Sequence, residues 1–393
     1  RLVSIPDFDV IIPRRGTGSL KYDAAVKRGK PADVLPFWVA DMDFQSPPAV
    51  LEALSERVAH GIFGYTEPME EGYFQALQNW YRQRFQWECR PEWLVITPGV
   101  VFALCAAIRA LTQPGDAVLI QQPVYYPFET SIKINDRRLV VNRLVYEDGR
   151  YSVDLAAFER QIAEEKVKLF ILCSPHNPVG RVWTREELRA MGDICLKHGV
   201  YVVADEIHAD FVYPGHRHWV FAGLRPEYED ITVTCTAPSK TFNLPGLQVA
   251  NIFIKNEQIR RLFLQEIRKT GYSQPNVLGL VACRAAYEHG APWLEALLAY
   301  LTGNLALVRD FLREELPQVR LVEPEGTYLL WLDFRALGLP DRELEELLVQ
   351  KGRIWLSSGP TFGAGGEGFQ RLNIGCPRAL LQEGLQRMKE ALL

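Results

Sequence analysis

The sequence lacks the features that mark several large classes of protein. Its seven cysteines are widely scattered and none forms a CxxC pair, which argues against a disulfide scaffold or a metal site and favours a reducing cytoplasm. It has no basic tail and a net charge of −4, so nucleic acid is not an expected partner. It shows no cleavable signal pattern and no apolar run that we judge long enough to span a bilayer, so no membrane is expected either.

What the chain does have is an ordinary globular composition, with 48% apolar and 23% charged residues. Its 393 residues exceed the size at which one hydrophobic core usually stops growing. Length and composition together predict a protein of two domains.

Short apolar runs alternate with amphipathic stretches through the middle of the chain. The runs that predict buried strands are Trp93–Thr97, Ala117–Gln121, Lys168–Cys173, Val200–Ala204, Ile231–Cys235 and Val249–Ile254. Helical patterns lie between several of them, as in Thr184–His198, where a threonine cap is followed by glutamates. This alternation predicts an α/β fold with a mostly parallel sheet covered by helices on both faces.

The pattern changes after about Leu280. Helix-like and strand-like segments then follow one another at Trp293–Leu316 (helix), Gly326–Asp333 (strand), Asp341–Lys351 (helix) and after Phe369 (strand, then helix). We expect a smaller α+β domain there, with the aperiodic N-terminus packed against it as an arm. The predicted division is residues 1–45 for the arm and part of the small domain, 46–284 for the large domain and 285–393 for the small domain.

Three of the predicted strands are followed by side chains of different chemistry. Asn177, Asp205 and Lys240 come just after three successive strands. The carboxyl ends of parallel strands meet at one edge of a sheet, so an amide, a carboxylate and an amine are expected in one crevice. A buried lysine amine loses its charge readily, which suits Schiff-base formation. A carboxylate there suits a pyridinium nitrogen, and an amide can donate to a phenolate oxygen on the same ring.

A candidate anion site follows the first strand. Gly99, Val100 and Val101 stand where Trp93–Thr97 ends and a helical pattern begins. Glycine allows a close turn, and a helix N-terminus presents free N–H groups to an anion such as phosphate.

Each signal has a simpler alternative when taken alone. Asn177 stands between prolines and suits a turn, and Asp205 suits a helix N-cap. Lys240 suits a solvated loop, and most strand–glycine–helix turns like that at Gly99 bind nothing. Only the common position at strand ends favours one site over four separate structural roles.

Several motifs in order resemble pyridoxal-phosphate (PLP) enzymes of the aspartate-aminotransferase fold type (fold type I), and more narrowly the cystathionine β-lyase branch, the MalY/PatB type C–S lyases. The matching segments are residues 14–17 (Arg-Arg-Gly-Thr), 38–44 (Trp-Val-Ala-Asp-Met-Asp-Phe), 63–65 (Phe-Gly-Tyr), 174–181 (Ser-Pro-His-Asn-Pro-Val-Gly-Arg), 205–210 (Asp-Glu-Ile-His-Ala-Asp), 237–243 (Ala-Pro-Ser-Lys-Thr-Phe-Asn) and 369–378. The resemblance covers nearly the whole chain. It implies a large domain with a mostly parallel seven-stranded sheet beside a smaller α+β domain.

The resemblance also implies roles for particular residues. Lys240 would bind the cofactor covalently and Asp205 would pair with its pyridine nitrogen. The other cofactor contacts would come from Asn177, Tyr125 (with Tyr126 as its rival for the ring face), His208, Gly99, Val100, Val101, Thr236 and Ser239. Tyr65 would reach the partner's phosphate across a homodimer interface and share in catalysis with Lys240. Substrate would contact Arg371, Asn177 and Ala40, with Arg371 holding the α-carboxylate; the alternative for Arg371 is a surface strand residue.

Two positions depart from the usual aminotransferase pattern. His208 stands where many aminotransferases have tyrosine, and this change resembles the lyase branch. Gln248 stands where many carry an arginine for the phosphate. The phosphate charge would therefore be met by amides, hydroxyls and a helix dipole.

The function that the resemblance implies is β-elimination from L-cystathionine or related cysteine S-conjugates, giving pyruvate, ammonia and a thiol such as homocysteine. An aminotransferase on the same scaffold is the alternative. A regulator that binds a transcription factor, a second role in this branch, is a third possibility, although nothing in the chain resembles a DNA-binding module.

Overall fold

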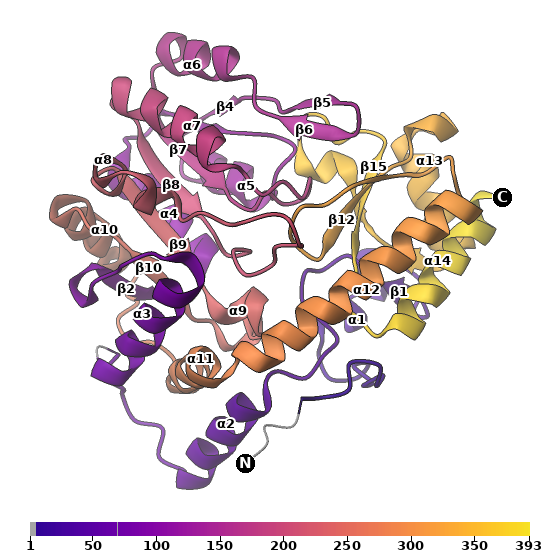
Figure 1. The fold of residues 1–393 in the computed structure, drawn as a ribbon, viewed down its shortest axis with the longest axis horizontal. Helices are drawn as coiled ribbons and strands as arrows, with labels where there is room; N and C mark the ends of the chain where they lie inside the picture. The colour runs from indigo at the N-terminus through magenta and orange to yellow at the C-terminus, as the bar shows by residue number, and fades with distance from the viewer. Residues whose placement is uncertain (1–4, 69) are drawn as a thin grey trace.

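The structure is a computed structural model that describes residues 5–68 and 70–393. Figure 1 shows a central sheet flanked by helices and a second, smaller sheet beside it, near the C-terminus. The long helix α12 (Ala291–Glu315) runs diagonally across the molecule between the two parts.

The central sheet has seven strands in the order β2-β10-β9-β8-β7-β3-β4. Their bounds are β2 Leu94–Thr97, β3 Ala117–Ile120, β4 Arg138–Val141, β7 Val167–Cys173, β8 Tyr201–Asp205, β9 Thr232–Thr236 and β10 Ala250–Phe253. Only β10 runs antiparallel to its neighbours, so the predicted mostly parallel sheet is confirmed. Strand β4 was not among the predicted strands, because it is a short edge strand in which only Val140 is buried.

Helices cover both faces of this sheet, as predicted. One face carries α4 (Val100–Leu111), α5 (Pro127–Ile134) and α10 (Glu257–Lys269), and the other α6 (Leu155–Glu164), α7 (Arg185–Lys197) and α8 (Pro226–Glu229). The predicted cap of α7 is present: the Thr184 hydroxyl accepts from the Glu187 amide at 3.1 Å, and the Glu187 carboxylate accepts from the Thr184 amide at 2.9 Å.

The second sheet is antiparallel, in the order β11-β12-β15-β14. Its strands are β11 Arg320–Val322, β12 Leu329–Asp333, β15 Phe369–Asn373 and β14 Ser357–Ser358, and near it lie α13 (Asp341–Glu346), a π-helical turn (Leu347–Lys351) and α14 (Arg378–Leu392). The N-terminal segment, with α1 (Leu20–Asp23), joins this part because β1 (Leu35–Pro36) pairs with β13 (Ile354–Trp355). The expected N-terminal arm thus packs beside the C-terminal elements.

The remaining elements complete the large part of the molecule. Helices α2 (Pro48–His60) and α3 (Glu71–Phe85) pack on α11 (Val277–His289). A hairpin joins β5 (Val145–Glu147) and β6 (Arg150–Ser152), and the single turn α9 (Pro238–Thr241) follows β9.

Helix α12 corrects one expectation. By length and composition alone it is apolar enough to cross a membrane, so the prediction that no such run exists is wrong on that criterion. One face of the helix is nevertheless part of the hydrophobic core, through residues such as Trp293, Leu297 and Val308. Asn304 on the same helix is buried and donates to the carbonyl oxygens of Ile374 and Cys376, both at 3.0 Å. These are the contacts of a core helix.

All seven cysteines are free thiols, and only Cys105 is not fully buried. Burial raises the pKa of the other six well above the usual range for a thiol: Cys89, Cys173, Cys195, Cys235, Cys283 and Cys376.

Candidate active site

A cavity of about 410 Å³ opens at the carboxyl edge of the central sheet. Most of the predicted site residues line it: Ala40, Gly99, Val100, Val101, Tyr125, Asn177, Asp205, His208, Ser239 and Lys240. The strand order explains this, because β7, β8 and β9 are adjacent and parallel, and their ends deliver Asn177, Asp205 and Lys240 to one place.

Lys240 lies in α9, directly after β9, with its amine toward the cavity. Its Nζ donates to the carbonyl oxygen of Ala40 at 3.4 Å. Desolvation, together with the positive charge of Arg371, lowers the pKa of the Lys240 amine to about 8, although Asp41 and Asp205 oppose the shift. Lys240 is half-buried in the cavity wall rather than solvated in a loop. The lowered pKa makes a neutral amine more accessible near physiological pH, which suits bond formation to an aldehyde.

Asp205 is the last residue of β8 and is buried. Its Oδ1 accepts from the Ile207 amide at 3.2 Å, and burial, reinforced by Glu206, raises the pKa of the carboxyl to about 7. No cation lies within 4.0 Å of this carboxylate in the described ranges 5–68 and 70–393. A buried carboxylate without a cation fits a ligand that brings its own positive charge, such as a protonated pyridine nitrogen.

Arg371 lies on β15 and is 4% exposed, which excludes the surface alternative. Its Nη1 donates to Oδ1 of Asn177 at 3.2 Å, and its Nη2 donates to the Trp38 carbonyl oxygen at 2.7 Å. Its Nε is buried without a partner, and desolvation lowers the pKa of the guanidinium to about 10. Arg371 is not among the residues that line the cavity, but it is hydrogen-bonded to Asn177, which is. Its unused donor fits a carboxylate.

The residues of the predicted anion site lie at the start of α4. Gly99 precedes the helix, and the first-turn amides of Val100 and Val101 have no acceptor within the helix. Ser239 and Gln248 also line this cavity. Lys240 is the one residue of lysine or arginine type among the described residues that line it, so amides and hydroxyls are the groups available to a phosphate.

Thr236 is placed differently from the prediction. It is buried in β9, does not line the cavity, and its hydroxyl donates to the Asn251 carbonyl oxygen of the neighbouring strand at 2.7 Å. Its single proton is used inside the sheet, so the structure argues against its predicted contact with phosphate.

Tyr125 and His208 both lie in the cavity wall. Tyr125 is largely buried and its amide donates to the Asn177 carbonyl oxygen at 3.0 Å, whereas the rival Tyr126 is 46% exposed. The His208 ring is buried with Nδ1 unpartnered, and burial holds its pKa well below the usual range. His208 is therefore a neutral ring beside the candidate cofactor site.

Tyr65 lies outside the cavity. Its side chain is 93% exposed, in the loop between α2 and α3. Within one chain it contacts nothing at the site, so its predicted role requires a second copy.

The prediction missed Tyr328 and the carbonyl of Trp38; within residues 38–44 it named only Ala40. Tyr328 is buried just before β12, and its hydroxyl donates to the Ala40 carbonyl oxygen that also accepts from Lys240. Trp38 provides the carbonyl that holds Arg371. Every residue has a backbone carbonyl, so the sequence does not show which carbonyls accept hydrogen bonds from the site. Only the motif match at 38–44 pointed to this segment.

Known proteins resemble this chain in sequence and in fold. Residues 32–388 match the family described as aminotransferase class I and II. The chain is 46% identical to cystathionine β-lyase PatB of Bacillus subtilis over 386 residues, covering 98% of this chain and 100% of that one. It is 35% identical to protein MalY of Escherichia coli over 388 residues, 98% of each chain. Cystalysin of Treponema denticola, solved with a pyridoxal 5'-phosphate cofactor, superimposes with a TM-score of 0.95 at 39% identity, over 99% of each chain. By its sequence, its fold and the residues gathered at its sheet edge, this chain belongs to the class I and II aminotransferase family.

Proposed function

We propose that this chain is a PLP-dependent carbon–sulfur β-lyase that cleaves L-cystathionine or related cysteine S-conjugates to pyruvate, ammonia and a thiol. The observation that carries the proposal is one cavity lined by Lys240, Asp205 and Asn177, with the Arg371 guanidinium hydrogen-bonded to Asn177. The similarity to relatives named cystathionine β-lyase favours elimination over amino transfer on this shared scaffold.

The described residues fit the cofactor. The Lys240 amine, with its lowered pKa, suits the aldehyde of the cofactor, and the Asp205 carboxylate, which has no cation beside it, suits the pyridine nitrogen. The N-terminus of α4 and Ser239 suit the phosphate. Tyr125 would lie against the ring. When bound, PLP supplies an electron sink for the negative charge left at the substrate Cα.

The chain's own residues would perform the rest of the reaction. Arg371 binds the substrate α-carboxylate through its free donor. The Lys240 amine, once released, takes the Cα proton as general base. The Cβ–S bond then breaks, and the electron pair leaves on sulfur, which takes up a proton, with Lys240 or a nearby tyrosine as the donor. The released unsaturated amino acid reacts with one water to give pyruvate and ammonia.

A homodimer with shared sites belongs to the same proposal. The exposed Tyr65 follows a run of exposed apolar side chains at the end of α2, including Val58 (54%), Ile62 (65%) and Phe63 (56%). Burial against a second copy would remove this surface from water and bring Tyr65 to the partner's phosphate site. We also propose the division into residues 1–45, 46–284 and 285–393, and a cytoplasmic location, which suits seven free cysteines.

The test is to incubate the cofactor-loaded chain with L-cystathionine and to measure pyruvate with no keto acid added. We expect sustained pyruvate release, with a thiol formed in equal amount. Lys240→Ala is the control and should release none. Conversion of the cofactor to its amine form once per site, with no further pyruvate, would establish an aminotransferase instead.

A further inference from the structure

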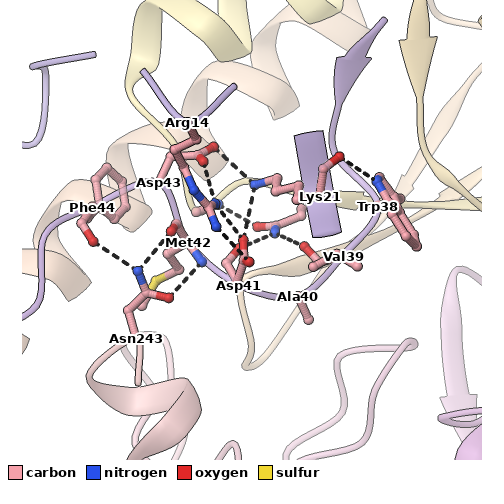
Figure 2. Close-up of polar contacts among 12 residues, drawn as sticks. Arg14, Lys21, Trp38, Val39, Ala40, Asp41, Met42, Asp43, Phe44 and Asn243 are labelled. Carbon is pink, nitrogen blue, oxygen red and sulfur yellow. Dashed lines mark hydrogen bonds and ion pairs between the residues drawn. The ribbon is translucent and has the colours of Figure 1, made fainter. Parts of the chain in front are cut away.

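Residues 38–44 form an irregular segment between β1 and α2, here called the strap. The carbonyl oxygens of the strap accept hydrogen bonds from side chains instead of pairing in a sheet. The donors are Arg371 and Ser357 (to Trp38), Asn373 (to Val39 and Asp41), Lys240 and Tyr328 (to Ala40) and Asn243 (to Met42 and Phe44). Figure 2 shows Asn243 below the strap and the charged side chains of Arg14 and Lys21 above it.

The strap touches both groups on which the proposed reaction depends. The Trp38 carbonyl oxygen accepts from the Arg371 guanidinium at 2.7 Å. Two residues later, the Ala40 carbonyl oxygen accepts from the Lys240 amine at 3.4 Å, and Ala40 itself lines the cavity. A shift of the strap therefore moves the acceptors of both cations at once.

Arg14 holds the strap from the N-terminal arm. Its guanidinium binds Asp41 in two-pronged fashion at 2.8 and 2.9 Å, and Nη1 also donates to Oδ1 of Asp43 at 2.8 Å. Lys21, which is 1% exposed, donates to the other oxygen of Asp43 at 3.0 Å. The fork geometry of arginine fixes position as well as charge. Among the described residues, removal of Arg14 would leave Asp41 with no closer cation than Lys21 at 3.9 Å.

We propose that Arg14 is a positioning residue: by binding Asp41 and Asp43 it fixes the strap, so that the Trp38 and Ala40 carbonyls hold Arg371 and Lys240 in place. The proposal rests on the proposed function for the roles of those two cations. The charge of Asp41 also reaches the site, because it raises the pKa of both Lys240 and Tyr328. The other charged groups that act on Lys240 are Arg371 and Asp205.

The neighbouring arginine offers a matched control. Arg15 belongs to the same arm and makes two hydrogen bonds of similar length, to the carbonyl oxygens of Ala32 (2.7 Å) and Val34 (2.9 Å), but none to the strap. Both guanidinium groups lie 5.5 Å from the ring centre of Tyr22. Arg15→Met therefore perturbs the arm as Arg14→Met does, without releasing Asp41 and Asp43.

The experiment compares Arg14→Met, Arg14→Lys and Arg15→Met with the wild type. Amide hydrogen exchange of peptides covering residues 38–44 is measured on each chain, and kcat and KM for L-cystathionine on each loaded enzyme. We expect faster exchange in the strap of Arg14→Met and a loss in kcat/KM of about 10- to 100-fold, typical of a misplaced reacting group. Arg14→Lys keeps the charge but not the fork and should fall between Arg14→Met and the wild type. Arg15→Met should match the wild type in both readouts.

The proposal would be overturned if the strap of Arg14→Met exchanged its amide hydrogens at the wild-type rate and kcat/KM were unchanged. It would also be overturned if Arg15→Met lost as much kcat/KM as Arg14→Met. If Arg14→Met does not fold, the proposal is tested on Arg14→Lys alone. Strap exchange and kinetics equal to those of the wild type in Arg14→Lys would count against a positioning role for the two-pronged guanidinium. Failure of the proposed function is separate. If the wild type releases no pyruvate, the proposed function is wrong. Whether Arg14 positions the Lys240 amine is still decided by amide exchange in the strap and by the pH dependence of Lys240 modification with an amine-directed reagent.

Discussion

The guanidinium of Arg371 donates to the side-chain oxygen of Asn177 at 3.2 Å, and this contact joins the smaller sheet to the carboxyl edge of the larger one. Arginine has no acceptor, so Asn177 must offer its Oδ1 and turn its NH₂ group elsewhere. Asn177 lines the cavity, and its donor is then free for a ring oxygen there. One contact thus orients the candidate cofactor ligand and the candidate substrate ligand together.

Arg371→Lys should weaken substrate binding more than cofactor binding. A lysine ammonium at this place cannot bind Trp38, Asn177 and a carboxylate with the planar fork of arginine. We expect KM for L-cystathionine to rise by about tenfold or more, which corresponds to the 1.5–3 kcal/mol of a hydrogen bond to a charged group. The visible absorbance of the lysine-bound cofactor should remain. Arg335→Lys, an exposed position that pairs with Asp333, is the control. An unchanged KM would remove Arg371 from the substrate site.

Asp205→Asn should stabilise the cofactor-free chain in a pH-dependent way. The folded-state pKa of Asp205 is raised to about 7 from 3.8, so folding favours the protonated form. Wild-type stability should therefore fall relative to the variant as pH rises from about 4 to about 7, and the gap should stay constant above that. Thermal unfolding of both cofactor-free chains across this range checks the prediction. A difference in stability between the wild type and Asp205→Asn that does not depend on pH would show that Asp205 is ionised over the whole range.

The Lys240 amine should react at lower pH than an ordinary lysine. With a pKa of about 8, roughly a tenth of it is neutral at pH 7, against about one part in three thousand at the usual 10.5. In the cofactor-free chain, modification by an amine-directed reagent, mapped by mass spectrometry, should rise through about pH 8 at Lys240. Arg371→Gln should move this midpoint upward, because the Arg371 charge is one cause of the lowered pKa. A midpoint near 10.5 would contradict the desolvation of the amine.

Mixed dimers should restore activity to two inactive variants. Tyr65→Ala and Lys240→Ala each damage a different half of the proposed shared site. After co-expression, half of the dimers are mixed and one of their two sites is intact, so about a quarter of wild-type activity is expected. The separately purified variants, combined without subunit exchange, are the control. Activity no higher than the average of the two variants would mean that Tyr65 does not act across an interface.

The parts of the fold that the sequence predicts are those with a strong local signal. The buried strands and the capped helix α7 are recognised because apolar periodicity and the Thr184 cap are visible in single segments. The edge strand β4 was not recognised because only one of its four residues, Val140, is buried. The predicted Gly326–Asp333 strand begins only at Leu329, because the Thr327 backbone has a positive φ of 68° and its amide donates to the Phe211 carbonyl oxygen outside the sheet.

The candidate site follows the same rule. Asn177, Asp205 and Lys240 could be placed together from sequence because strand order in a parallel sheet determines which ends meet. The hydroxyl of Thr236 could not be placed, since its direction depends on the antiparallel neighbour β10. The strap depends on contacts between segments about 200 residues apart, such as Ala40 with Lys240, and no local pattern encodes them.

The burial of the cysteines has a consequence for a protein whose proposed product is a thiol. Thiols and the disulfides that form from them exchange with any accessible protein thiolate, because the thiolate is the attacking species. Six thiols here are buried and kept protonated by their surroundings. Cys173 lines the cavity itself, yet burial, reinforced by Asp205, raises its pKa above the usual range. At these six positions the folded chain would therefore resist mixed-disulfide formation with the compounds that it releases.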